Sequence, residues 1–120
     1  MNKKAMTELV KTILSHEAEP GWILDIIYCR DRDIVPLNLR FKGKKRSTDV
    51  LAFDLGESGQ KAGEVYVNLQ MAKRQAYENH VSYIEEVKRL TVHGVLHLLG
   101  YGDDTPVKHS KMWARQESYL

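Results

Sequence analysis

The chain has 120 residues, a length that fits one domain. Hydrophobic residues make up 42% and charged residues 28%, a balance that excludes a wholly disordered chain. A single cysteine, Cys29, excludes intrachain disulfides and zinc sites built from several thiolates, and the net charge of +2 neither requires nor excludes nucleic acid as a partner.

The start of the chain predicts a helix and then a strand. Residues 3–18 carry apolar side chains at three- and four-residue spacing, at Met6, Leu9, Val10, Ile13 and Leu14. Pro20 and Gly21 end this helix. Residues 22–28 are rich in Trp, Ile and Tyr, which favour a pleated surface, and they predict a strand. Cys29 continues the same apolar run, which indicates a small core residue rather than a reactive thiol.

Residues 31–41 fit two alternatives. Their apolar side chains alternate along the segment, as is typical of a strand, at Val35, Leu37, Leu39 and Phe41. Asp33 could instead cap a short helix with Pro36 in its first turn. Periodicity does not decide between the two.

Two short strands and a helix follow. Residues 48–54 and 64–67 predict strands separated by a glycine-containing turn. The two strands either form a hairpin or occupy other places in one sheet. Asn68 is positioned to cap a helix over about residues 69–79.

The last two predicted helices have the clearest start signals. Ser82 and Glu85 have the spacing of a capping box. One apolar face follows, formed by Ile84, Val87, Thr91, Val95 and Leu98. Gly100 ends that helix, and Thr105 with Pro106 begins the next. The apolar residues of the last segment are Val107, Met112, Trp113 and Leu120. This order predicts an α+β fold, with a small mixed sheet packed with several helices in a single domain.

Two histidines on one helix face are the most informative feature. His93 and His97 are four residues apart, so their rings project from neighbouring turns and can chelate one metal ion. The spacing is that of metalloproteases, but Gly94 stands where their catalytic glutamate would be. After Gly100 the chain turns, and Asp103 or Asp104 can supply a carboxylate. Two imidazoles and one carboxylate leave an open position for water, which is the catalytic pattern for zinc.

A basic segment lies earlier in the chain. Residues 40–46 hold five cations in seven residues and no acid. Channels for single-stranded nucleic acid use such charge to follow the phosphates, although the segment also fits a solvated loop.

Three stretches together resemble the YbeY family. Residues 93–104, HGVLHLLGYGDD, are similar to the family signature H-G-x-L-H-L-x-G-Y-D-H. Residues 38–41 followed by STDVLAF resemble its N-x-x-Y-R…T-D-V-L-S-F segment, and residues 63–67, GEVYV, resemble its G-D-I-x-I strand. The resemblance covers nearly the whole chain. It implies a small mixed sheet with helices around it, and a short helix rather than a strand over residues 33–41.

The resemblance implies a set of three metal ligands, and this chain differs from the family pattern at three positions. Family members bind one metal ion, usually zinc, through three histidines. The first two correspond to His93 and His97, and the third falls on Asp103, or on Asp104 if the register slips at Gly102, where the family has Asp. Aspartate is a competent ligand that makes harder ions such as manganese more plausible. Lys42 stands where the family has a functional arginine. A lysine keeps the positive charge but cannot form the two parallel hydrogen bonds to phosphate that an arginine forms.

By resemblance, residues 1–120 are expected to form a single YbeY-like, metal-dependent hydrolase domain. The expected function is a single-strand-specific metallo-endoribonuclease in maturation of the small-subunit rRNA 3′ end and in ribosome quality control. It would hold one divalent ion, zinc, at His93, His97 and Asp103, with Lys42 and Arg46 contacting phosphate. Its partners would be the rRNA precursor and the small ribosomal subunit.

Two other functions also fit the sequence. One is a metallopeptidase-like hydrolase, against which the glycine at position 94 argues. The other is a ribosome-associated RNA-binding protein whose metal site is structural or lost. The longest nearly apolar stretch, residues 22–29, is shorter than the about 20 residues that cross a bilayer. Glu8 and Lys11 interrupt any signal-peptide core, so a cytoplasmic protein with no membrane association is expected.

Overall fold

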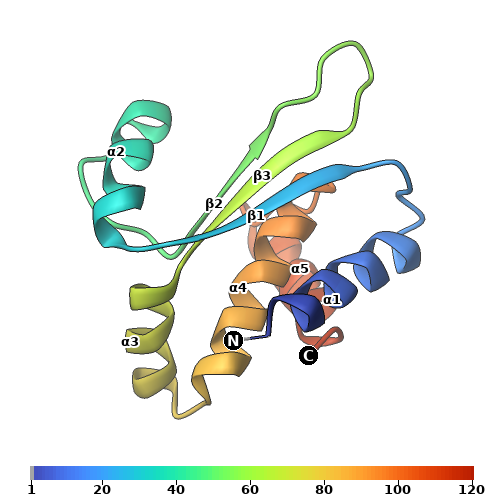
Figure 1. Ribbon diagram of the computed structural model, residues 1–120. Helices are drawn as coiled ribbons and strands as arrows, with labels where there is room; N and C mark the ends of the chain where they lie inside the picture. The colour runs from blue at the N-terminus through green and yellow to red at the C-terminus, as the bar shows by residue number, and fades with distance from the viewer. Residues whose placement is uncertain (1) are drawn as a thin grey trace.

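The computed structural model describes residues 2–120, which form five helices and three strands (Figure 1). In chain order the elements are α1 (Lys3–His16), β1 (Ile23–Cys29), α2 (Asp31–Lys42), β2 (Val50–Asp54), β3 (Ala62–Asn68), α3 (Leu69–Asn79), α4 (Tyr83–Leu98) and α5 (Pro106–Glu117). Within these residues no helix has the length and apolar character needed to cross a membrane.

The three strands form one mixed sheet in the order β1-β3-β2. β1 runs parallel to β3, with Ile23 opposite Ala62 and Cys29 opposite Asn68. β2 runs antiparallel to β3, with Val50 opposite Val67. The hairpin alternative for β2 and β3 is therefore the observed one, and the prediction of an α+β fold with a small mixed sheet is confirmed.

Side-chain caps set the starts of several helices. Asn68 Oδ1 accepts hydrogen bonds from the amides of Gln70 and Met71, at 3.0 and 3.3 Å. Ser82 Oγ accepts from the Glu85 amide at 3.0 Å, and Thr105 Oγ1 accepts from Lys108 at 3.2 Å. These bonds satisfy amides that have no partner within the helix. The predicted starts of α3, α4 and α5 are confirmed.

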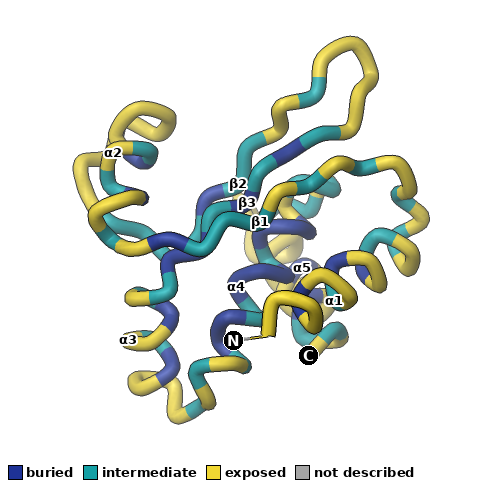
Figure 2. Tube along the Cα trace, viewed as in Figure 1, coloured by how far each residue is buried: buried dark blue, intermediate teal, exposed yellow. Residues whose placement is uncertain are grey.

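One face of the sheet packs against α4, and α1 and α5 contribute to the same core (Figure 1). The centre of this core contains Ile13 of α1, Val65 and Val67 of β3, and Val92 and Leu96 of α4, all fully buried. Figure 2 shows the buried stretch of α4 beneath the sheet, between half-buried and exposed segments. Because α4 lies at the centre, its position relative to the sheet determines where its histidines lie.

The other face of the sheet is covered only near α2. Ile34 of α2 packs with Cys29 of β1 and Leu51 of β2 in a second, smaller core. Burial, with the carboxylates of Asp33 and Asp31 nearby, raises the pKa of the Cys29 thiol to about 11. Cys29 is thus the inert core residue that the sequence indicates.

Residues 31–42 are helical, so the strand alternative, which the alternation of apolar residues favours, is wrong. Ile34 and Asn38, four residues apart, are buried, whereas Leu39 and Phe41 are exposed. Asp33 Oδ2 accepts a hydrogen bond from the Arg30 amide at 2.9 Å, as a residue in the first turn can. The helix begins at Asp31, earlier than the cap at Asp33 predicts, so Pro36 lies inside it rather than in its first turn.

Two predicted apolar faces are wrong in part. Ile84 is 40% exposed, whereas Val92 and Leu96 are buried although the predicted face omits them. On α5, Val107 is 78% and Trp113 48% exposed. That helix turns Met112 and Gln116 inward instead. Leu120 lies beyond the end of α5.

Candidate functional site

His93 and His97 lie on neighbouring turns near the end of α4. His93 is half-buried and His97 is exposed. After Leu98 the helix ends, and Gly100 adopts a left-handed φ of 104° that turns the chain away from the helix axis. The two imidazoles are therefore held on a rigid helix, directly before an irregular segment that returns toward them.

A cleft of about 170 Å³ opens beside these histidines. It is lined by Lys42 of α2, Val50, Leu51 and Ala52 of β2, His93, Gly94 and His97 of α4, and Asp103. The structure thus brings together four of the five residues proposed for the site from the sequence. Arg46 does not line this cleft, and its carbonyl oxygen accepts a hydrogen bond from Asn38 Nδ2 at 3.0 Å.

Gly94 lets α4 lie directly against the sheet at this cleft. A Cβ atom at this position would overlap Val65 Cγ1 and come within 3.1 Å of Val50 Cγ2. Both neighbours are β-branched side chains with little freedom to move. The glycine between the two histidines therefore permits close packing of helix and sheet.

Asp103 and Asp104 follow in an exposed segment between α4 and α5. Asp103 lines the cleft. Asp104 points toward Lys108, with Oδ1 3.4 Å from its Nζ. The two carboxylates therefore have different surroundings, although they are adjacent in the chain.

The donors around the cleft are of the types that a divalent ion binds. Two imidazoles and a carboxylate form a common catalytic set for zinc. Within residues 2–120, no three His, Cys, Asp or Glu side chains are arranged to hold one ion as they stand. The residue types fit a metal, and Asp103, which is exposed in irregular chain, is the donor free to adjust.

A buried amide contacts the first histidine. Gln116 of α5 is 2% exposed, and its Oε1 lies 2.8 Å from His93 Nδ1. The sequence motifs give no indication of Gln116, because it lies 23 residues from His93 on another helix. Thr91 and Tyr101, which lie close to the two histidines in the sequence, bond elsewhere: Thr91 donates to the Val87 carbonyl, and Tyr101 donates to Glu17.

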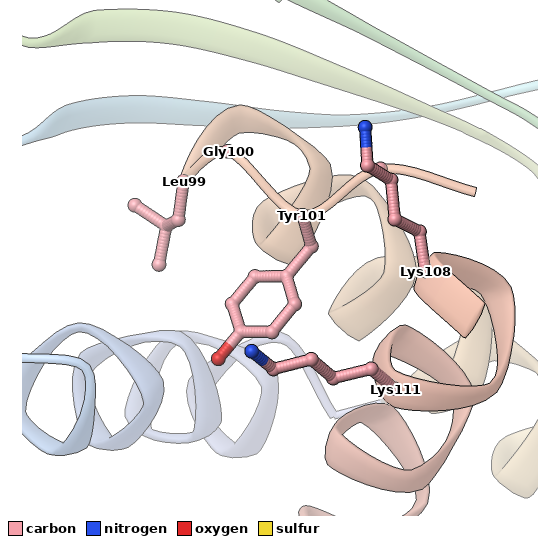
Figure 3. Close-up of a pocket in the computed structure, with 6 residues that line it drawn as sticks. Leu99, Gly100, Tyr101, Lys108 and Lys111 are labelled. Carbon is pink, nitrogen blue, oxygen red and sulfur yellow. The ribbon is translucent and has the colours of Figure 1, made fainter. Parts of the chain in front are cut away.

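A second hollow lies next to the irregular segment. It measures about 350 Å³ and is lined by Leu99, Gly100, Tyr101, Gly102, Lys108 and Lys111. Figure 3 shows the Tyr101 ring reaching toward α1, with the side chain of Lys111 extending beside it and that of Lys108 extending away from it toward the sheet. The Tyr101 hydroxyl is 2.5 Å from Glu17 Oε1, which ties the segment after α4 to the end of α1.

The basic segment, residues 40–46, begins in the last turn of α2 and continues beyond the helix. Gly43 ends the helix with a φ of 70°, and the Lys44 amide donates to the Asn38 carbonyl at 3.3 Å. Asn38 is 3% exposed and holds this turn through both its backbone and its side chain. Phe41 is 54% exposed, and the Arg40 guanidinium lies 5.3 Å from its ring centroid. Lys42 lines the cleft, whereas the Phe41 ring packs against Phe53 of β2, with ring centroids 4.8 Å apart.

Comparison with known proteins gives consistent matches over the chain. The family model described as Endoribonuclease YbeY matches residues 1–120. The protein named Endoribonuclease YbeY from Chlorobaculum tepidum is 30% identical over 120 residues, which cover 100% of this chain and 88% of that protein. The protein of the same name from Persephonella marina is 36% identical over 117 residues, covering 93% and 76%. A solution structure from Thermotoga maritima has a TM-score of 0.71 at 29% identity, covering 97% of this chain and 77% of that one.

Proposed function

The chain belongs to the YbeY family of endoribonucleases, and from that membership we propose that its cleft cleaves single-stranded RNA with the help of one divalent metal ion. The observation that carries this proposal is the composition of the cleft. Two imidazoles, one carboxylate and one lysine from three separate parts of the chain line the same space of about 170 Å³. Residues 1–120 act as one hydrolase domain in this proposal.

His93, His97 and Asp103 hold the ion. A divalent ion bound there supplies polarisation of a phosphoryl oxygen and activation of water. The supporting observation for Asp103 over Asp104 is that Asp103 lines the cleft, whereas Asp104 is within 3.4 Å of Lys108 Nζ. Zinc is the proposed ion, since both imidazole and carboxylate are among its usual ligands.

Lys42 binds the phosphate beside the ion. In this proposal the ammonium group of Lys42, a residue that lines the cleft, stabilises negative charge that develops on the phosphoryl group. Arg46 and the other cations of residues 40–46 contact the RNA backbone outside the cleft.

The proposed substrate is the small-subunit rRNA precursor at its 3′ end, with the small ribosomal subunit as partner and a role in ribosome quality control. The cytoplasm is the proposed location, because the lone, buried Cys29 fits a reducing compartment.

The experiment compares RNA cleavage by two histidine variants. Purified protein is stripped with a chelator, reloaded with Zn²⁺, and incubated with a single-stranded RNA oligonucleotide and with the matching duplex. We expect cleavage of the single strand only, its loss on stripping, and its recovery on reloading. His97→Ala should abolish cleavage and metal retention, whereas His16→Ala, the matched change at an exposed histidine at the end of α1, should change neither.

The alternatives give different results in the same assays. Cleavage of a generic peptide, but not of RNA, would indicate a metallopeptidase-like hydrolase. RNA binding without cleavage, unaffected by the chelator, would indicate an RNA-binding protein with a structural or lost metal site. Either result would overturn the proposal.

A further inference from the structure

The amide of Gln116 has a defined orientation between two partners. Its Nε2 lies 3.2 Å from Glu117 Oε2, and its Oε1 lies 2.8 Å from His93 Nδ1. A carboxylate only accepts hydrogen bonds, so the NH₂ end of the amide faces Glu117. The amide oxygen, which also only accepts, therefore faces the imidazole.

The orientation of the Glu117 carboxylate is fixed by hydrogen bonds from an arginine. Arg89 of α4 donates to both of its oxygens, each at 2.9 Å. The same guanidinium is 3.3 Å from an oxygen of Glu86, which is 2% exposed. Arg89 is only 16% exposed, so solvent screens these contacts less than it would at the surface. The carboxylate that orients the Gln116 amide cannot easily turn away.

This orientation dictates where the imidazole of His93 carries its proton. Because Gln116 Oε1 can only accept, the hydrogen bond requires a proton on Nδ1. In the neutral ring the lone pair is then on Nε2. We propose that Gln116 is a positioning residue, which fixes the Nδ1–H form of His93 and leaves Nε2 as the metal-binding nitrogen. The inference rests on the proposed function, in which His93 holds the ion.

The chain offers variants that separate this role from packing. Gln116→Met keeps the length of the side chain and removes the acceptor. The double variant Gln116→Glu with Glu117→Gln restores an acceptor facing Nδ1 and an amide donor beside it. Met112→Leu changes the other inward-facing residue of α5, which is 2% exposed, and serves as the packing control.

Two readouts test the inference. In metal-free protein, two-bond ¹H–¹⁵N correlation spectra report which ring nitrogen of His93 is protonated. We expect the Nδ1–H form in the wild type, in Met112→Leu and in the double variant, and loss of that form in Gln116→Met. In Zn²⁺ titrations against a competing chelator, Gln116→Met should bind about 10–100-fold more weakly, as loss of a hydrogen bond to a ligating histidine generally does. The double variant should recover most of this affinity.

Three results would contradict the inference, and each can be distinguished from the others. An Nε2–H form of His93 in the wild type overturns the inference, whatever the variants do. Zn²⁺ affinity in Gln116→Met equal to that of the wild type overturns the inference alone and leaves the proposed function intact. A wild type that retains no Zn²⁺ overturns both. If Gln116→Met does not fold, the wild-type spectrum and the affinity of the double variant still decide.

Discussion

Asp103 and Asp104 are adjacent in the sequence but face different groups. Asp103 lines the cleft with His93 and His97, and Asp104 is paired with Lys108 at the surface. An exposed pair of this kind contributes little to stability, so Asp104 is a suitable matched control for its neighbour.

We expect Asp103→Ala to lose the metal and Asp104→Ala to retain it. Removing the carboxylate leaves two protein ligands, whereas removing Asp104 takes away only a surface contact. Parallel Zn²⁺ titrations of the two variants provide the measurement. Loss of metal from Asp104→Ala instead would mean that the register is shifted by one residue. Retention by both would make another side chain the third ligand, with His109 of α5 the next candidate.

Asp103→His should bind metal with a changed preference. An imidazole replaces an anionic oxygen with a neutral nitrogen, which suits zinc better than manganese. We expect the ratio of Zn²⁺ to Mn²⁺ affinity to rise relative to the wild type, measured by competition between the two ions. Asp104→His is the control and should leave the ratio unchanged. An unchanged ratio in Asp103→His would show that this position does not contact the ion.

At the scale of elements, the position of α4 against the sheet depends on the absence of a side chain at Gly94. Gly94→Ala gains about 1 kcal/mol of helix propensity. It also forces a methyl group onto Val65 and Val50, and overpacking of this kind costs about 1–3 kcal/mol. We expect a net loss of up to about 2 kcal/mol in the free energy of unfolding, measured by urea denaturation.

A double-mutant cycle checks that cause. Val65→Ala removes the methyl group that the new Cβ would overlap. The double variant should therefore lose less stability than the sum of the two single changes. Additive losses would mean that steric overlap is not the reason.

Asp31 joins the start of α2 to the segment before β2 and to α3. Arg74 donates to both of its oxygens, at 3.0 and 2.9 Å, and Ser47 and Asn68 donate to Oδ1. The Arg74 guanidinium and these two donors hold the pKa of the Asp31 carboxyl well below its usual value. The network fixes the chain that leads from the basic segment into β2.

We expect this network to weaken in acid. A carboxyl whose pKa is lowered on folding contributes stability above its unfolded pKa of about 3.9, and that contribution is lost as pH falls toward the folded pKa. Asp31→Asn should lower the free energy of unfolding at pH 7 and flatten its decline below about pH 4. Asp25→Asn, at an exposed position on β1, is the control. Equal pH profiles for Asp31→Asn and the wild type would contradict the assignment.

Some helices and strands could be predicted from local sequence signals, and others could not. Caps at Asn68, Ser82 and Thr105 predict three helix starts, because each depends on a local hydrogen bond. Residues 31–42 could not be assigned from their periodicity, because their alternation does not match the burial. Ile84 and Trp113 are exposed although neighbouring residues on the same helices are buried, because tertiary packing determines which side of each helix faces the core.

At the scale of the whole molecule, the cleft is assembled from distant segments. Lys42 ends α2, Ala52 lies on β2, and His93 and Asp103 come from α4 and the segment after it. The histidine pair could be found from the sequence because both rings are on one helix. Gln116 could not, since its contact with His93 joins two helices that only the fold brings together.

The distribution of charge over the whole molecule determines where RNA is attracted. The net charge is only +2, so attraction for RNA must come from where cations gather; residues 40–46 hold five, of which Lys42 lines the cleft. Each phosphate contact on a single strand contributes a slope of about −0.7 to log affinity against log salt. Changing Lys42, Lys44 and Lys45 to Ala should flatten the slope by up to about 2, measured by fluorescence anisotropy with a labelled single strand.

The matched control removes the same charge elsewhere. Lys3, Lys4 and Lys11 lie on α1, away from α2 (Figure 1), and their replacement by Ala should leave the slope near that of the wild type. If both triple variants flatten the slope equally, RNA responds to net charge alone. If neither does, residues 40–46 are a solvated loop. Only a difference between the two variants supports an RNA path that follows α2 into the cleft.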